Sequence, residues 1–191
     1  MTKPSFPRGE VVHLRRPTAA DRDRFIELVH ASRTLHGSWV HAPRDGQSYA
    51  ALLRRAHTPT DERLLVCRND DGAIAGTYHL SQIFRGPFCN AYLGCYAFAP
   101  YARQGYMREG LSLLLAHAFG PLGLHRIEAN IQPENTASIA LMKGAGFRLE
   151  GLSSRYLKVA GEWRDHERWA ITVEDLDGGG VRRPRAGDRK N

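Results

Sequence analysis

The segment from residue 91 to residue 132 limits the fold most, because three different apolar patterns follow one another there. AYLGCYAF (91–98) predicts a strand, which Pro100 ends. Further along, apolar side chains recur at the 3.6-residue spacing of one helix face: Leu111, Leu114, Leu115, Ala118 and Phe119. HRIEANIQ (125–132) then alternates apolar and polar side chains, which predicts a strand with one buried face.

Further strands and helices are predicted on both sides of this segment. Before it, we expect a strand at 11–17, a helix opened by a capping box of Thr18 and Asp21, a helix at 47–57, and strands at 62–69 and 73–84. After it, we expect a short helix within 133–147 and strands at about 147–158 and 163–173. The order β-α-α-β-β-β-α-β-α-β-β describes an α+β fold, a mixed sheet with helices packed on it.

Length and composition indicate one globular domain followed by a tail. The chain has 191 residues, of which 42% are hydrophobic and 25% charged, and these values are ordinary for a globular protein. We assign residues 10–175 to one domain. The chain ends in GGGVRRPRAGDRKN, which is glycine-rich, basic and almost without apolar residues, so we predict a disordered basic tail at 176–191.

Charge and motif content exclude several classes of function. The formal net charge of +7 suits an anionic ligand or partner but does not single out nucleic acid. Zinc-finger spacing and paired histidines are absent, so we predict no metal site. The sequence has neither an apolar run of the roughly 18 residues that span a bilayer nor a signal-peptide core at its N-terminus. We therefore expect a cytoplasmic protein without a membrane partner, whose three cysteines are reduced.

A basic turn with one glycine precedes the helix that carries the 111–119 stripe. Gly105 stands between Gln104 and Tyr106, with Arg103 and Arg108 close by. One interpretation is a loop whose glycine relieves backbone strain. The other is an anion site, because the first turn of a helix presents unpaired N–H groups. The turn alone does not decide between them.

Three separate stretches resemble the RimJ-like branch of the GNAT N-acetyltransferases, the ribosomal-protein-alanine N-acetyltransferases. They are FRGPFCNAYLGCYAFAP (84–100), LHRIEANIQPENTASIALMKGAGFRLEG (124–151) and GEWRDH (161–166). The similarity covers about residues 10–175. It implies the GNAT fold, with a twisted, largely antiparallel mixed sheet of about seven strands flanked by about four helices. It also implies acetyl-CoA as co-substrate.

In this family the glycine turn carries Q/R-x-x-G-x-G/A, whose backbone amides hold the pyrophosphate of acetyl-CoA. Ala102 and Met107 depart from that pattern here, although the main contacts come from backbone N–H groups. The resemblance also implies backbone donors to the thioester oxygen near the end of the strand at 91–98. The implied contacts with acetyl-CoA are Tyr96, Ala97, Phe98, Arg103, Gln104, Gly105, Tyr106, Met107, Arg108, Asn135 and Ser138.

Asn135 and Ser138 have both a structural and a functional interpretation. Asn135 can cap the helix that follows it, with Ser138 at the third helical position. In the related enzymes the matching asparagine and serine lie beside the pantetheine and the thioester sulfur. The resemblance therefore implies that Ser138 protonates the departing thiolate.

The proton acceptor is where the sequence departs most from its relatives. Arg155 stands where related enzymes can carry an acidic residue, and arginine cannot accept a proton. Glu128 is our first substitute and Glu109 our second. Alternatively, Glu128 forms a cross-strand ion pair and Glu109 interacts with the helix dipole.

The sequence leaves three functions open. The leading one is transfer of acetyl to the N-terminal amine of a protein or peptide, by analogy a ribosomal protein that begins with alanine. Trp39 and Tyr156 would then line the acceptor groove, with the loops at 33–48 and 84–90 shaping it. The acceptor could instead be a small amine, such as an antibiotic or a toxin. The third is a non-catalytic module that binds CoA or ribosomes. Homodimer formation stays open.

Overall fold

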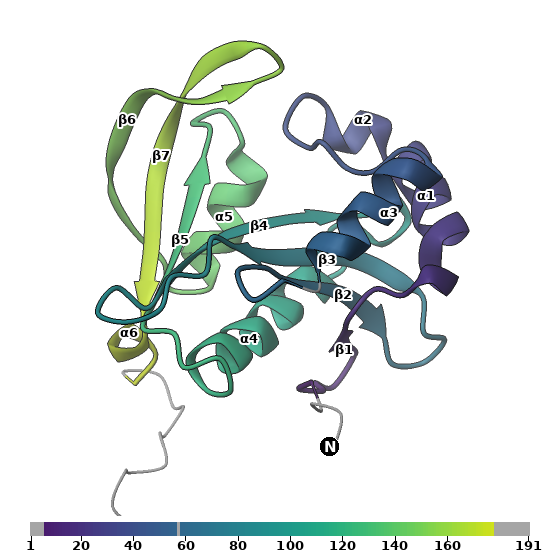
Figure 1. Cartoon of the computed structure of the whole chain (residues 1–191), viewed down its shortest axis with the longest axis horizontal. Coiled ribbons are helices and arrows are strands. Elements are labelled where there is room, and N and C mark those ends of the chain that lie inside the picture. Colours follow the sequence, from purple (N-terminus) through teal and green to yellow (C-terminus); the bar gives the residue numbers. More distant parts are fainter. Residues whose placement is uncertain (1–5, 57, 178–191) are drawn as a thin grey trace, which may run out of the picture.

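The computed structural model describes residues 6–56 and 58–177, whose centre is a seven-stranded sheet in the order β1-β2-β3-β4-β5-β7-β6 (Figure 1). Neighbouring strands are antiparallel except β4 and β5, which are parallel. The strands are β1 (Val12–Arg15), β2 (Glu62–Arg68), β3 (Ile74–Ser81), β4 (Asn90–Ala97), β5 (Arg126–Ile131), β6 (Arg148–Val159) and β7 (Glu162–Thr172).

In the described part of the chain, six α-helices accompany the sheet: α1 (Arg22–Ala31), α2 (Arg33–His36), α3 (Gly46–Arg55), α4 (Tyr106–Phe119), α5 (Thr136–Gly144) and α6 (Val173–Asp177). The predicted order of strands and longer helices is confirmed. The sequence did not predict α2 and α6, because four and five residues are too few to show a periodic apolar face. None of the helices in the described part of the chain has the length and apolar content of a bilayer-spanning segment.

The two ends of the predicted domain differ in detail from the expectation. The capping box forms, and Thr18 donates from both its backbone N–H and its hydroxyl to Asp21 at 2.8 Å, but it opens a 3-10 turn (Ala19–Asp21) that leads into α1. At the other end, α6 runs to Asp177, two residues into the stretch that we assigned to the tail. The rest of that tail, residues 178–191, lies outside the described residues.

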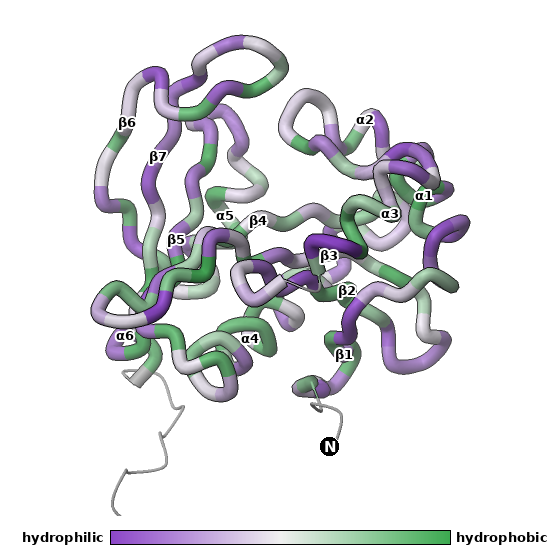
Figure 2. The backbone as a smooth tube through the Cα atoms, in the orientation of Figure 1, coloured by the Kyte–Doolittle hydropathy of each residue, from purple (hydrophilic) through white to green (hydrophobic). Residues whose placement is uncertain are grey.

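Helices cover both faces of the sheet, and β2 shows why. Successive strand residues point to opposite faces, so Leu64 and Val66 join one apolar core while Leu65 and Cys67 join another. The first core includes α4 and Met142 of α5, and Figure 2 shows hydrophobic residues along α4. The second core is covered by α1 and α3. As predicted, the 111–119 stripe and the apolar residues of β5 are core positions: Leu111, Leu114, Leu115, Ala118, Ile127, Ala129 and Ile131.

The parallel pair β4 and β5 is paired over only three positions. Its register runs from Asn90 opposite Arg126 to Tyr92 opposite Glu128. Beyond Tyr92, β4 continues along β3 to Ala97, and β5 continues along β7 to Ile131. The two strands therefore separate toward their carboxyl ends, which opens a gap in the middle of the sheet.

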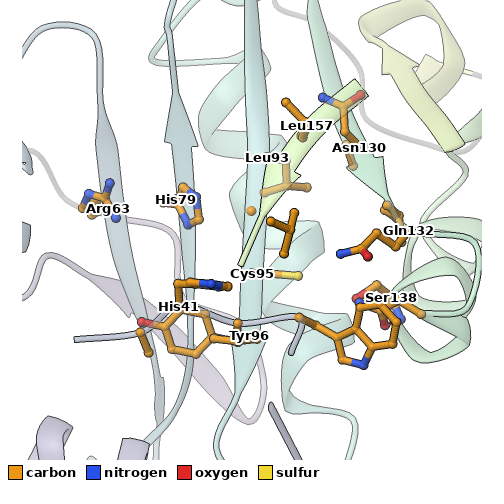
Figure 3. Close-up of a pocket in the computed structure, with 18 of the residues that line it drawn as sticks. His41, Arg63, His79, Leu93, Cys95, Tyr96, Asn130, Gln132, Ser138 and Leu157 are labelled. Atoms are coloured by element: carbon orange, nitrogen blue, oxygen red, sulfur yellow. The ribbon is translucent and has the colours of Figure 1, made fainter. Parts of the chain in front are cut away.

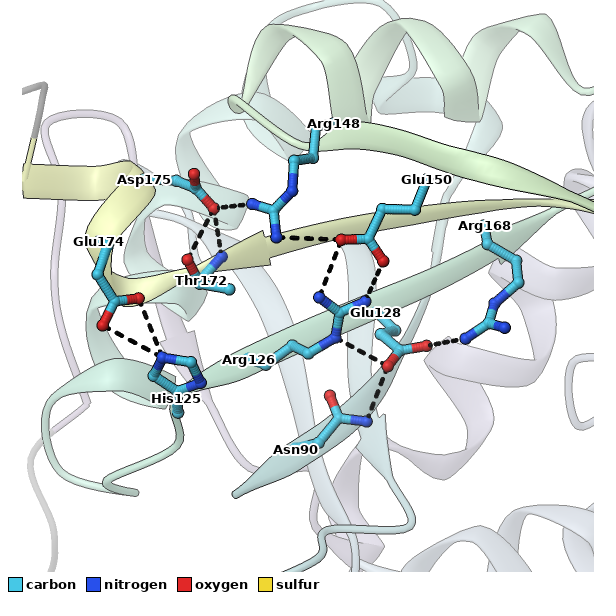
Figure 4. A network of polar contacts seen from close by, with 10 residues as sticks. All are labelled: Asn90, His125, Arg126, Glu128, Arg148, Glu150, Arg168, Thr172, Glu174 and Asp175. Atoms are coloured by element: carbon cyan, nitrogen blue, oxygen red, sulfur yellow. Dashed lines mark hydrogen bonds and ion pairs between the residues drawn. The ribbon is translucent and has the colours of Figure 1, made fainter. Parts of the chain in front are cut away.

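A network of ion pairs around the buried Glu128 holds the closed end of this gap together (Figure 4). The Glu128 carboxylate accepts hydrogen bonds from Arg126 at 2.9 Å, from Arg168 at 3.2 Å and from the Asn90 amide at 3.2 Å. Arg126 also pairs with Glu150 of β6. The network joins β4, β5, β7 and β6, so the strands are held together at one end and diverge at the other.

We predict that α4 is a main contributor to stability. Leu114 is 0% exposed, so Leu114→Ala should lower the free energy of unfolding by about 3 kcal/mol through lost burial and an unfilled cavity. Leu152→Ala is the matched control, because Leu152 is 59% exposed and should change stability by less than about 0.5 kcal/mol. Urea unfolding followed by circular dichroism measures both, and equal losses would contradict the assignment of α4 to the core.

Candidate active site

The turn before α4 has the backbone geometry of an anion site. Arg103 and Gly105 have left-handed φ angles of 62° and 85°, and Gly105 is the N-cap of α4. The Gln104 side chain closes the turn by donating to the Pro100 carbonyl at 3.0 Å. The first bond within the helix runs from the Glu109 N–H to the Gly105 carbonyl at 3.1 Å. The N–H groups of residues 106–108 therefore lack partners in their own helix and point outward from its N-terminus.

A cavity of about 400 Å³ begins at this turn and extends to the N-terminal half of α5. For brevity we call it the turn cavity. It brings together all but one of the residues predicted to contact acetyl-CoA: Tyr96, Ala97, Arg103, Gln104, Gly105, Tyr106, Met107, Arg108, Asn135 and Ser138. It fits a nucleotide pyrophosphate, since free amides and two exposed arginine side chains lie at one end.

Phe98 is the exception, for a structural reason. Its side chain is fully buried in the second core, and its N–H donates to the Ala75 carbonyl of β3 at 2.9 Å. Hydrogen-bonded pairs alternate along an antiparallel ladder, so the backbone groups of Tyr96 also face β3. Those of Cys95 and Ala97 face the gap. Of the three predicted positions 96–98, only Ala97 therefore has backbone groups that face the gap, and Cys95 is a second such position.

His36 fixes this end of β4. Its Nε2 lies 2.8 Å from the Ala97 carbonyl oxygen, which can only accept, so Nε2 carries the hydrogen. Burial lowers the pKa of His36, which favours the neutral ring. Ser32 adds a second contact, because its hydroxyl oxygen accepts from the Ala99 N–H at 2.9 Å. The end of α1 and α2 thus hold the strand that borders the gap.

A second cavity, of about 610 Å³, lies on the far side of the gap and is called here the acceptor cavity. Residues of the loop at 39–43, of α3, of the sheet and of the β6–β7 hairpin line it. Figure 3 shows Ser138 and Gln132 at one side of it and Arg63 and His79 at the other. Six residues line both cavities: Trp39, Val40, Cys95, Tyr96, Asn135 and Ser138. The two cavities therefore meet beside Ser138.

Ser138 is held where its hydroxyl can act on a ligand. The Asn135 side chain accepts from the Ser138 N–H at 3.2 Å, which confirms the predicted cap of α5. Ser138 is half-buried, and its hydroxyl makes no hydrogen bond to any other described residue. The hydroxyl is therefore available at the junction of the two cavities.

The two glutamates predicted as proton acceptors lie away from both cavities. Glu109 accepts from the Val11 N–H at 3.1 Å and 3.3 Å, which ties α4 to β1. Glu128 belongs to the network at the closed end of the gap, as its alternative interpretation expected. Neither residue is among those that line the cavities. No aspartate or glutamate occurs among the described residues lining either cavity.

The two predicted acceptor residues have different positions. Trp39 is 37% exposed and lines both cavities. Tyr156 lines neither of them, and its ring lies 5.8 Å from the Arg168 guanidinium and 6.2 Å from the His166 ring. Its neighbours Leu157 and His166 do line the acceptor cavity.

The sequence analysis did not identify several residues that line the acceptor cavity, above all His79 and Arg63. They pair in register with each other, and His79 pairs with Gly94 of β4. A Cβ at Gly94 would lie 2.1 Å from the His79 ring, so only glycine leaves space for this histidine. A glycine inside a strand pattern was the one signal available. Burial, together with the charge of Arg63, lowers the pKa of His79 to about 4, so the ring is neutral near pH 7.

The fold agrees with comparisons to known proteins. The family described as the acetyltransferase (GNAT) domain matches residues 12–148, well over half of the chain. The chain belongs to the GNAT acetyltransferase family. The protein is therefore an N-acetyltransferase that uses acetyl-CoA as co-substrate.

Individual relatives are similar at a lower level. The chain is 29% identical over 177 residues to the probable N-acetyltransferase YjcK of Bacillus subtilis, covering 88% of this chain and 97% of that protein. It is 35% identical over 106 residues to the [ribosomal protein uS5]-alanine N-acetyltransferase of Escherichia coli, about half of each chain (56% and 55%). The solved structure of Mycobacterium smegmatis RimJ in complex with CoA-disulfide has a TM-score of 0.79 at 29% identity, covering 86% of this chain and 83% of that chain.

We predict that the conformation of Gly105 controls the affinity of this GNAT enzyme for acetyl-CoA. Gly105→Val puts a β-branched residue at a left-handed φ, where about 1–2 kcal/mol of strain should raise the Kd about tenfold. Gly123→Val is the matched control, because Gly123 has a φ of 64° and similarly open surroundings but lines neither cavity. Isothermal titration calorimetry measures both, and an unchanged Kd for Gly105→Val would argue against the turn as the pyrophosphate site.

Proposed function

We propose that this enzyme transfers the acetyl group of acetyl-CoA to the N-terminal α-amino group of a protein, with a ribosomal protein that begins with alanine as the first candidate. The observation that carries the proposal is the acceptor cavity, which has no carboxylate among the described residues that line it. An acceptor used in such a site must lose its proton without a strong base. Similarity to proteins named as [ribosomal protein uS5]-alanine N-acetyltransferases supports the same acceptor.

The pKa of the acceptor amine decides how much help it needs. An α-amino group has a pKa of about 7.7–8.0, so forming the neutral amine at pH 7 costs about 1 kcal/mol. Forming the neutral amine of a lysine side chain, with a pKa of about 10.4, costs about 4.6 kcal/mol at that pH. A cavity without a carboxylate therefore favours N-termini over lysine side chains.

The proposed transfer uses few groups of the chain. The amine nitrogen forms a bond to the acetyl carbonyl carbon, the carbon–sulfur bond breaks, and the sulfur leaves as a thiolate. We assign protonation of this thiolate to the hydroxyl of Ser138, a residue that lines both cavities, and the hydroxyl regains its proton from water. The N–H groups of Cys95 and Ala97 are assigned to the thioester oxygen, where negative charge develops. The proton lost by the amine passes to water, and Glu128 and Glu109 are no longer part of the proposal.

The acceptor class is tested by measuring free thiol released from acetyl-CoA with an Ala-starting peptide, its N-acetylated form and an N-acetylated lysine peptide. Only the free N-terminus should react efficiently. Its kcat/KM should rise with pH and level off near pH 8, because the amine itself must be neutral. A plateau below pH 6.5 would mean that a group of the enzyme sets the profile, and turnover confined to lysine side chains would reject the proposal.

Ser138→Ala tests the proposed acid. Loss of the hydroxyl should lower kcat by more than about tenfold, while the Kd for acetyl-CoA stays nearly constant because the main contacts are backbone amides. Thr136→Ala is the control: Thr136 is exposed in the first turn of the same helix and lines neither cavity. Steady-state kinetics with calorimetry separate the two effects. Equal kcat values for Ser138→Ala and the parent enzyme would remove Ser138 from the mechanism.

A further inference from the structure

Two residues that line the acceptor cavity each have a buried polar atom without a hydrogen-bond partner among the described residues. The two atoms are Nε of Arg63 on β2 and Oδ1 of Asn130 on β5. One is a donor and the other an acceptor, and they stand on opposite sides of the gap. Buried polar atoms are nearly always paired, so unpaired atoms on two residues that line one cavity point to a ligand that meets these side chains when they turn toward it.

The surroundings of Arg63 carry an excess of positive charge. Its side chain is 15% exposed, and its nearest carboxylate oxygen, Asp61 Oδ1, is 3.3 Å away. The same Asp61 oxygen is also 3.7 Å from Nε of Arg55, so two guanidinium groups share one carboxylate. Burial lowers the pKa of Arg63, the opposing attraction of Asp61 being weaker, which marks a cation that has lost solvation. An anion entering the cavity would supply the missing charge.

The sheet fixes the distance between the Arg63 guanidinium and the point where the two cavities meet. Arg63, His79 and Gly94 form one cross-strand row over β2, β3 and β4. Adjacent strands are about 4.8 Å apart, so the backbone of β2 lies about 10 Å from that of β4, where the gap begins. His79 stands between them as a neutral ring and adds no charge of its own near pH 7.

We propose that the acceptor is a peptide N-terminus with an acidic side chain at its second or third residue, which Arg63 binds while Asn130 Oδ1 accepts a hydrogen bond from the reacting amine. The proposal rests on the proposed function and names its substrate class. An extended chain advances about 3.3 Å per residue, so the carboxylate of a third residue reaches about 10 Å from the amine. A polycationic acceptor would instead meet Arg55 and Arg63 without a carboxylate on the cavity wall.

Three otherwise identical peptides test the charge preference: Ala-Ala-Glu, Ala-Ala-Gln and Ala-Ala-Lys, each extended by the same neutral tail. The parent enzyme should acetylate the Glu peptide with a kcat/KM at least about tenfold above that of the Gln peptide, as expected for one charged hydrogen bond. The Lys peptide should be the poorest. Equal values for the Glu and Gln peptides would overturn the inference, whereas no turnover of any peptide would reject the proposed function itself.

Variants assign the preference to Arg63. In Arg63→Gln the kcat/KM of the Glu peptide should be less than about threefold that of the Gln peptide, whatever the absolute rate. Arg63→Lys keeps the charge, so its ratio of the two kcat/KM values should be intermediate. Arg54→Gln is the matched control, since Arg54 is an exposed neighbour on α3 that does not line the cavity. A retained Kd for acetyl-CoA shows that each variant is folded. An unchanged ratio in folded Arg63→Gln would overturn the role of Arg63.

Two further measurements test the other parts of the inference. Asn130→Leu should lower kcat/KM about fivefold for the Glu and Gln peptides alike, because it removes a hydrogen bond to the amine that both share. A loss confined to the Glu peptide would reject this role.

The free dipeptide Ala-Glu and its C-terminal amide, assayed in the same way, test whether the acceptor is a small molecule. Faster acetylation of the free dipeptide than of the Glu peptide would identify a small amino acid derivative and overturn the assignment to peptide N-termini.

Discussion

The structure depends on the interrupted pairing of two parallel strands. β4 and β5 are paired over three positions and then diverge, although a continuous ladder would satisfy more backbone groups. The divergence leaves the backbone of Cys95 and Ala97 facing a gap rather than a neighbouring strand. One of these groups, the Ala97 carbonyl, is taken by His36. The remaining donors face the point where the two cavities meet, so the break in the sheet is also what makes the site.

Charge is divided between the two ends of this gap. At the closed end, Glu128 and Glu150 are held by arginines and join four strands. At the open end, the acceptor cavity contains Arg55 and Arg63 and no carboxylate among the described lining residues. Glu128 and Glu150 thus serve the architecture of the sheet, while the residues where the two cavities meet provide hydroxyl and amide groups. This division explains why a glutamate on the polar face of β5 can resemble a catalytic base in sequence and still be a structural residue.

The site brings together parts of the chain that are far apart in sequence. α4 supplies free amides at its N-terminus, α5 supplies Ser138, and the loop after α2 supplies Trp39. Each of them is positioned by packing: α4 lies on the first core, and Asn135 caps α5. Ser32 and His36 connect α1 and α2 to the end of β4. These contacts bring the turn cavity and the acceptor cavity together beside Ser138.

The sequence by itself determined the order of the elements, the buried faces of α4 and β5, the cap at Asn135 and the glycine turn at Gly105, because each of these is a local pattern of periodicity or turn chemistry. The resemblance to GNAT enzymes added the family, the co-substrate and the position of Ser138. Only the tertiary structure decided which backbone donors face the gap, since this depends on the register between β3 and β4. It also decided that Glu128 and Glu109 are used elsewhere and that Arg63, His79 and Asn130 share a cavity. These contacts join residues on different strands, and no spacing within one segment encodes which partner a side chain meets across a sheet.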